Sequence, residues 1–149
     1  MTPEELKEYF GLAPHAENGA FSERHYGHFS SDRAASGSIF YYVGPDEITE
    51  FHRIDCDEYW CYSEGFPLDV WLISGDGRLS VRKLGTDEGC EPFVYVPKGT
   101  LFASRHSGNA DCGTFLVCIT VPRFEPAGFE LISKEEMLEK HPEAAGFYN

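Results

Sequence analysis

Apolar and polar residues alternate over short stretches along most of this chain, and such a pattern is typical of half-buried β-strands. Breaks rich in glycine and proline separate the stretches, and the Asp-Gly pair at 76–77 predicts a tight hairpin turn. Two strands are predicted around His52 and Glu58. The other predicted strands cover residues 21–26, 38–43, 68–73, 79–84, 93–96, 101–105, 114–120 and 129–131.

Helical signals occur only near the two ends of the sequence. Thr2-Pro3-Glu4-Glu5 is a capping box with proline at the first helical position, and it predicts a helix over about residues 3–10. Ser133-Lys134-Glu135-Glu136 has the same pattern and predicts a helix over about residues 134–141. We therefore expect an all-β sandwich or barrel at about residues 20–132, within one domain of residues 1–149.

Composition narrows the classes of partner. The net charge of −13 leaves no basic stripe for a phosphate backbone, so we expect no nucleic acid. No apolar run approaches the ~20 residues of a membrane helix, and the acidic first residues do not resemble a secretory signal. Five cysteines without metal-like spacing suggest thiols in a reducing compartment, so we expect a cytoplasmic protein without a membrane partner.

Residues 50–65 carry the densest group of reactive side chains. With a period of two, Glu58, Trp60 and Tyr62 share one face of a strand. A short turn at residues 55–57 is expected to bring His52 alongside Glu58. An imidazole, a carboxylate, an indole and a phenol on one concave surface predict a pocket for a small-molecule ligand.

The spacing in this stretch resembles the first motif of the cupin superfamily, G-x5-H-x-H-x3-E-x6-G. His52, Glu58 and Gly65 keep their positions, and Ile54 stands where the second histidine would be. The resemblance implies a double-stranded β-helix, the jelly roll of RmlC-like proteins, with short terminal helices.

The second cupin motif, P-x-G-x2-H, falls on Pro97-Lys98-Gly99 and has Phe102 in place of its histidine. Two of the four usual metal ligands are thus apolar here. A catalytic metal site usually has three protein ligands, so we expect no metal cofactor. The alternative is a divalent ion held by His52 and Glu58.

Further segments resemble one cupin family, the uncharacterised type five cupins with a domain of unknown function. The resemblance implies a homodimer and supplies no reaction. For His15 and Glu17, which lie in the first of these segments, we expect ordinary turn chemistry. The segments are Leu12–Glu23, His52–Leu68, Val96–Thr100, Val121–Leu131 and His141–Glu143.

Two classes of function stay open. The first is metal-independent acid–base chemistry of the isomerase or epimerase type on a polar, sugar-like metabolite, as in the sugar epimerases with a cupin scaffold. His52 would be the base, Glu58 its orienting partner, and Tyr62 or Tyr42 the acid. The second is a binding module without chemistry, and a metal-dependent enzyme that uses His52 and Glu58 is a further alternative. The expected pocket walls are Tyr42, Ile54, Trp60 and Phe102.

A second feature of the sequence also favours a homodimer. A jelly roll buries its inner face and leaves edge strands and outer apolar side chains that need a partner. Phe40, Tyr41 and Trp71 are the aromatic residues that we expect at such an interface.

Overall fold

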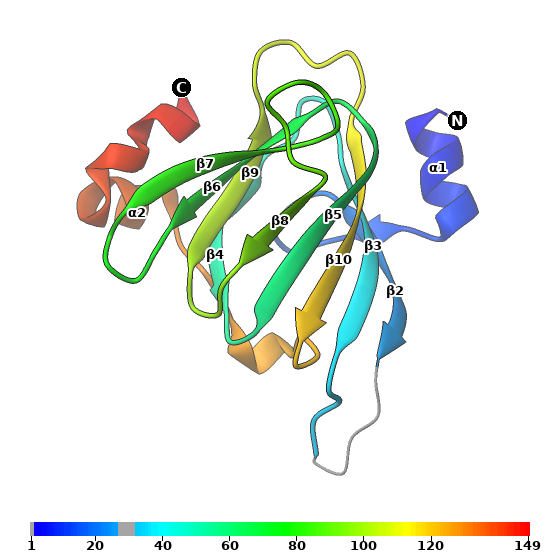
Figure 1. Cartoon of the computed structure of the whole chain (residues 1–149), viewed down its shortest axis with the longest axis horizontal. Helices are drawn as coiled ribbons and strands as arrows, with labels where there is room; N and C mark the ends of the chain where they lie inside the picture. Colours follow the sequence, from blue (N-terminus) through cyan, green and yellow to red (C-terminus); the bar gives the residue numbers. More distant parts are fainter. Residues whose placement is uncertain (1, 27–31) are drawn as a thin grey trace.

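A computed structural model describes residues 2–26 and 32–149 and shows two antiparallel sheets that face each other (Figure 1). The six-stranded sheet has the order β1 (Ala13–Pro14), β2 (Ala20–Tyr26), β3 (Gly37–Val43), β10 (Thr114–Val121), β5 (Asp57–Gly65) and β8 (Phe93–Val96). The five-stranded sheet has the order β11 (Phe129–Leu131), β4 (Thr49–Ile54), β9 (Leu101–His106), β6 (Leu68–Ile73) and β7 (Leu79–Leu84).

The predicted strands are confirmed, and the all-β jelly roll with them. The period of two is visible in β5, where Glu58 and Trp60 are buried and Asp57, Tyr59 and Cys61 are less so. A hydrophobic core fills the space between the sheets because each sheet turns one apolar face inward. The large buried side chains of this core include Trp60, Leu68, Phe102 and Leu116.

The two terminal helices cover outer faces of the sheets (Figure 1). Helix α1 (Pro3–Phe10) has the predicted capping box at Thr2 and Glu5, and Leu6 packs with Tyr42 and Phe115 of the six-stranded sheet. Helix α2 (Lys134–Lys140) begins at the cap Ser133 and ends one residue earlier than predicted, because His141 already leaves the helical conformation before Pro142.

The C-terminal segment seals the five-stranded sheet from outside. After α2 the chain continues as the 3-10 helix η2 (Pro142–Tyr148). Met137 and Phe147 form a second core with Phe51, Ile73 and Ala103 on the outer face of that sheet. No helix in residues 2–26 or 32–149 is long and apolar enough to cross a membrane.

One sequence expectation about the strands needs correction. His52 lies on β4 and pairs with Phe102 and Leu131, whereas Glu58 lies on β5 and pairs with Val96 and Thr120. The turn at residues 55–57 therefore carries the chain from one sheet to the other. His52 and Glu58 do not lie side by side in one sheet but project inward from opposite sheets.

Candidate functional site

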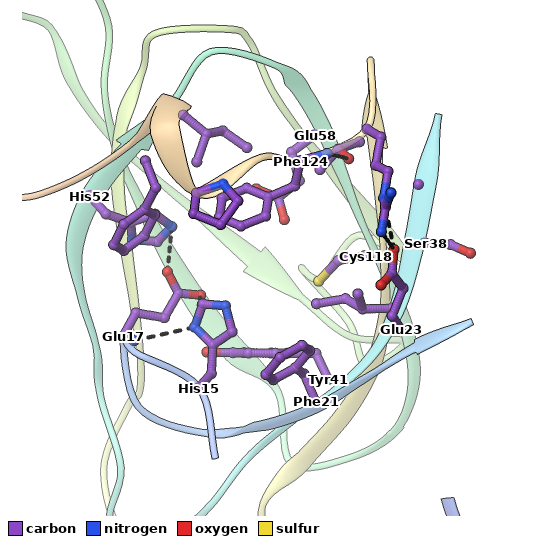
Figure 2. A pocket seen from close by; sticks show the side chains of 17 residues that line it. His15, Glu17, Phe21, Glu23, Ser38, Tyr41, His52, Glu58, Cys118 and Phe124 are labelled. Carbon is purple, nitrogen blue, oxygen red and sulfur yellow. Dashed lines mark hydrogen bonds and ion pairs between the residues drawn. The ribbon is translucent and has the colours of Figure 1, made fainter. Parts of the chain in front are cut away.

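A cavity of about 320 Å³ lies between the two sheets and contains both acidic and basic side chains (Figure 2). Its size suits a small organic molecule. Its apolar walls come from Phe21, Ile39, Tyr41, Ile54, Phe124 and Phe129. Its ionisable groups are His15, Glu17, Glu23, His52, Glu58, Cys118 and Arg123.

Glu17 enters the cavity from the turn between β1 and β2. Asn18 and Gly19 both adopt a positive φ there (78° and 79°), which reverses the chain and directs Glu17 inward. The Asn18 side-chain amide donates to the Ile48 carbonyl (3.1 Å), and the Glu50 amide donates to the Glu17 carbonyl (3.2 Å). These bonds hold the turn against β4, and only 5% of Glu17 is exposed.

His52 is held at both ring nitrogens. Its Nδ1 is 2.7 Å from the Glu50 carbonyl, which can only accept, so Nδ1 carries a proton. Its Nε2 is 2.6 Å from Oε2 of Glu17 (Figure 2). The ring packs on Phe102, with the two ring centres 4.0 Å apart. Glu17, not Glu58, is therefore the carboxylate that orients His52.

Glu17 and His52 stabilise each other's charged forms. Burial alone would raise the pKa of Glu17 and lower the pKa of His52. The opposite charge of the partner and the polar contact between them outweigh burial, so the pKa of Glu17 is lowered and the pKa of His52 is raised. The pairing thus favours the imidazolium form of His52 beside the carboxylate form of Glu17.

Glu58 reaches the cavity from the other sheet, and its electrostatic surroundings differ from those of Glu17 and His52. It is 8% exposed, and in residues 2–26 and 32–149 no basic side chain forms an ion pair with it. Burial, and then the negative charge of Glu17, raise the pKa of Glu58 to about 7, against smaller opposing contributions from His52, Trp60 and Cys118. A carboxyl group in this range can both accept and return a proton at neutral pH.

Three further titratable wall groups, those of Tyr41, Cys118 and His15, stay neutral near pH 7. Burial, followed by the charge of Glu17, raises the pKa of Tyr41 well above its usual value, and the Tyr41 hydroxyl donates to the Asn18 carbonyl (2.6 Å). Burial and the charge of Glu58 likewise raise the pKa of Cys118. Burial lowers the pKa of His15.

The predicted pocket residues fall into two groups. His52, Ile54 and Glu58 line the cavity. Trp60 and Phe102 lie in the core beneath it, where their rings meet edge to face with centres 5.8 Å apart. Both support the cavity from behind rather than forming its surface.

The two tyrosines predicted as acids do not line the cavity. Tyr42 points to the opposite face of the six-stranded sheet and packs under α1. Tyr62 is half-buried, and its hydroxyl donates to the Gly65 carbonyl at 2.7 Å. The tyrosine at the cavity is Tyr41, one residue before the predicted one.

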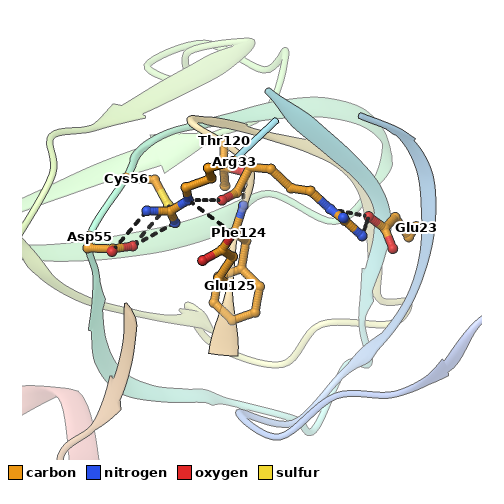
Figure 3. A network of polar contacts seen from close by, with 8 residues as sticks. Glu23, Arg33, Asp55, Cys56, Thr120, Phe124 and Glu125 are labelled. Atoms are coloured by element: carbon orange, nitrogen blue, oxygen red, sulfur yellow. Dashed lines mark hydrogen bonds and ion pairs between the residues drawn. The ribbon is translucent and has the colours of Figure 1, made fainter. Parts of the chain in front are cut away.

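A network of arginines and carboxylates lies beside the cavity, and two of its members, Glu23 and Arg123, belong to the cavity lining (Figure 3). Arg33 donates to both oxygens of Asp55 (2.9 and 3.0 Å) and to the Arg123 carbonyl (2.8 Å). Arg123 in turn pairs with Glu23 at 2.6 Å. The network joins the segment before β3, the β4–β5 turn and the segment after β10.

The donor set does not fit a cupin metal site. Ile54 and Phe102 supply no ligand atoms, and the ring nitrogens of His52 are already taken by Glu17 and Glu50. Within the described part of the chain, no three His, Cys, Asp or Glu side chains are grouped so that they could hold a metal ion.

A family model described as Cupin superfamily (DUF985) matches residues 4–132. The chain belongs to this cupin family. No curated protein sequence is significantly similar to it. The family explains the jelly roll and the inward positions of His52 and Glu58, and it assigns no reaction to them.

Solved structures show the same cupin fold. A protein from Shewanella oneidensis is 28% identical, with a TM-score of 0.90 over 98% of this chain and 94% of its own. A hypothetical protein from Leishmania major is 24% identical, with a TM-score of 0.88 over 96% of this chain and 94% of its own. A variant of oxalate decarboxylase from Bacillus subtilis is 15% identical, with a TM-score of 0.62 over 91% of this chain and 34% of its own, which shows the fold alone.

Sequence reasoning missed Glu17, the closest partner of His52. The sequence did carry a signal, because the segment around His15 and Glu17 is one of those that resemble the family. What it did not show is that the turn at Asn18 and Gly19 folds back against β4.

Proposed function

We propose that the chain is a metal-independent isomerase or epimerase that moves a proton on a small polar molecule in this cavity. The observation that carries the proposal is that two acid–base groups enter one cavity from opposite sheets. Glu58 comes from β5, and the His52–Glu17 pair comes from β4 and the β1–β2 turn. A planar reaction intermediate between them would be exposed to one group on each face.

The charge states suit proton removal on one face and proton return on the other. Ionised Glu58 accepts the proton as the carbon–hydrogen bond breaks, and the electron pair remains on the substrate as an enolate or its equivalent. The Nε2 proton that the His52 imidazolium shares with Glu17 then goes to the other face of the substrate, and a neutral imidazole remains beside the Glu17 carboxylate. Exchange of protons with water restores both groups.

The pKa of Glu58 supports this role. At about 7, the group is ionised in a large fraction of molecules at neutral pH and is still a stronger base than an ordinary carboxylate. The lining is mostly apolar, which makes each charge within it more effective than it would be in water. Tyr41 forms a wall rather than acting as the acid, because its hydroxyl already donates to Asn18.

Isotope exchange tests the proposal without knowledge of the product. The protein is incubated in D2O with a panel of aldoses, ketoses, hydroxy ketones and their amino derivatives, and proton NMR follows the loss of carbon-bound hydrogen. We expect exchange in at least one compound, and its rate should fall at least about 100-fold in Glu58→Gln.

Glu64→Gln is the matched control, because Glu64 lies on the same strand but is exposed. It should exchange at the wild-type rate. If the panel shows binding but no exchange, the cavity is a binding site without chemistry, which is the alternative function. Equal exchange rates in Glu58→Gln and the wild type would also contradict the proposal.

A further inference from the structure

The charged side chains that line the cavity form two ion pairs. The carboxyl group of Glu58 belongs to neither pair. Glu17 pairs with His52 at 2.6 Å, and Glu23 pairs with Arg123 at 2.6 Å. His15 is the other basic group of the lining, and burial keeps it neutral by lowering its pKa. Glu58 therefore has no counter-ion of its own among the described residues that line the cavity.

Glu58 is also enclosed, so water screens its charge poorly. Only 8% of the residue is exposed, and it lies in the cavity lining beside a second carboxylate, Glu17. An ionised carboxylate in such a place is costly unless a positive charge joins it. The cavity thus carries one net negative charge when Glu58 is ionised, and a bound cation would neutralise it.

The walls around this charge are aromatic. Phe21, Tyr41, Phe124 and Phe129 all contribute rings to the lining (Figure 2). The face of an aromatic ring attracts a cation, most strongly where water is excluded. The same surroundings disfavour an anion, which would meet Glu17, Glu58 and the ring faces. The basic group at the rim, Arg123, does not change this balance because Glu23 neutralises it.

We propose that the cavity binds a small organic cation, a protonated amine or a substituted ammonium ion, with ionised Glu58 as its counter-ion and the aromatic walls around it. The inference rests on the proposed function only in placing the ligand in the same cavity. It narrows the substrate class to molecules that carry a positively charged nitrogen.

Three probes of similar shape and different charge test the inference: benzylamine, benzyl alcohol and benzoate. Calorimetry at pH 8, where Glu58 is largely ionised and benzylamine is protonated, measures the affinity of each. We expect benzylamine to bind roughly tenfold more tightly than benzyl alcohol, the effect of one cation contact in a poorly hydrated site. Benzoate should bind most weakly.

Two variants assign the effect to Glu58. In Glu58→Gln the preference for benzylamine should disappear, while the affinity for benzyl alcohol stays at the wild-type level and shows that the cavity is intact. Glu64→Gln removes an exposed carboxylate from the same strand and should keep the preference.

Three results would overturn the inference: benzoate binding as tightly as benzylamine, a full preference for benzylamine in Glu58→Gln, or no binding of any probe at millimolar concentration. The outcome is independent of the isotope-exchange test. Charge selectivity without isotope exchange would support a cation-binding site that catalyses no reaction. Isotope exchange without charge selectivity would support the isomerase and contradict the inference that its ligand is a cation.

Discussion

At the scale of single residues, Glu58 shows how a functional group can be destabilising. Its pKa is raised from 4.5 to about 7, so the native state holds the Glu58 proton more tightly than the unfolded state does. Well below pH 4.5 Glu58 is protonated in both the native and the unfolded state, so its pKa shift does not change the free energy of unfolding. As the pH rises from 4.5 to 7, only the unfolded state releases the proton, so the free energy of unfolding falls. Above 7 the loss is complete.

We therefore expect Glu58→Gln to stabilise the protein relative to the wild type at pH 8 more than at pH 4.5. The change in that difference should be roughly 3 kcal/mol, since one pKa unit corresponds to about 1.4 kcal/mol and the unfolded state is already half-ionised at pH 4.5. Urea denaturation at a series of pH values measures it. Parallel stability curves for the two proteins would show that the native pKa of Glu58 is ordinary.

Glu17 should control the ionisation of His52. In Glu17→Gln the imidazole stays buried but loses its charged partner, so its pKa should fall below the usual value of 6.5 instead of lying above it. NMR titration of the labelled imidazole measures the change. Glu23→Gln is the control, because the Glu23 carboxylate pairs with Arg123. This variant should not change the pKa of His52. A similar fall in both variants would contradict a specific pair.

The choice between Tyr41 and Tyr42 marks a limit of the sequence analysis. Strand β3 is apolar on both faces, because the cavity lies on one side and α1 packs on the other. Its alternation therefore does not show which face is inside. In β5 the cupin-like spacing of His52, Glu58 and Gly65 indicated the inward face, and there the inward positions of Glu58 and Trp60 were predicted correctly.

At the scale of secondary-structure elements, the strands and both helix starts were predictable because each depends on local alternation or capping. The placement of strands in sheets was not. Strands β4 and β5 are separated by two residues and would ordinarily form a hairpin, yet they belong to different sheets. The distant Arg33 holds this turn through Asp55, and nothing in residues 50–65 indicates that contact.

Gly65 ends β5 at a place where only glycine fits. Its φ is +109°, and a Cβ atom there would collide with the backbone carbonyl of Gly113. We expect Gly65→Ala to destabilise the protein by about 3 kcal/mol or more, from backbone strain and the collision together. Thermal and urea denaturation would measure the loss.

Gly77 separates the two causes. It also has a positive φ, +80°, but a Cβ atom there would meet nothing within 4 Å. Gly77→Ala should therefore cost only about 1 kcal/mol, the effect of strain alone. An equal loss in both variants would mean that the contact with Gly113 is unimportant.

At the scale of the whole molecule, the aromatic residues first expected at a subunit interface already have partners within the chain. Tyr41 is a wall of the cavity, Phe40 packs edge to face on Phe10 of α1, and Trp71 meets Phe147 of η2. The dimer prediction therefore needs a different surface. The exposed aromatic side chains of the edge strand β8 provide one.

The β8 face consists of Phe93 and Tyr95, which point outward from the six-stranded sheet and are 52% and 44% exposed. Strand β8 is a sheet edge, and its unpaired backbone groups favour association with another chain. We predict a homodimer with two-fold symmetry through this face, since a self-complementary patch is the commonest arrangement in homo-oligomers. Light scattering after gel filtration should give twice the mass of one chain at micromolar concentration.

The double variant Phe93→Glu, Tyr95→Glu should convert this dimer to a folded monomer, because it places like charges opposite each other across the two-fold axis. Tyr9→Glu is the matched control: Tyr9 is 75% exposed but lies on α1, so this variant should remain dimeric. Circular dichroism distinguishes loss of association from loss of folding. A wild-type protein with the mass of one chain in light scattering would contradict the predicted dimer. A double variant that stays dimeric would place the interface elsewhere on the molecule, away from β8.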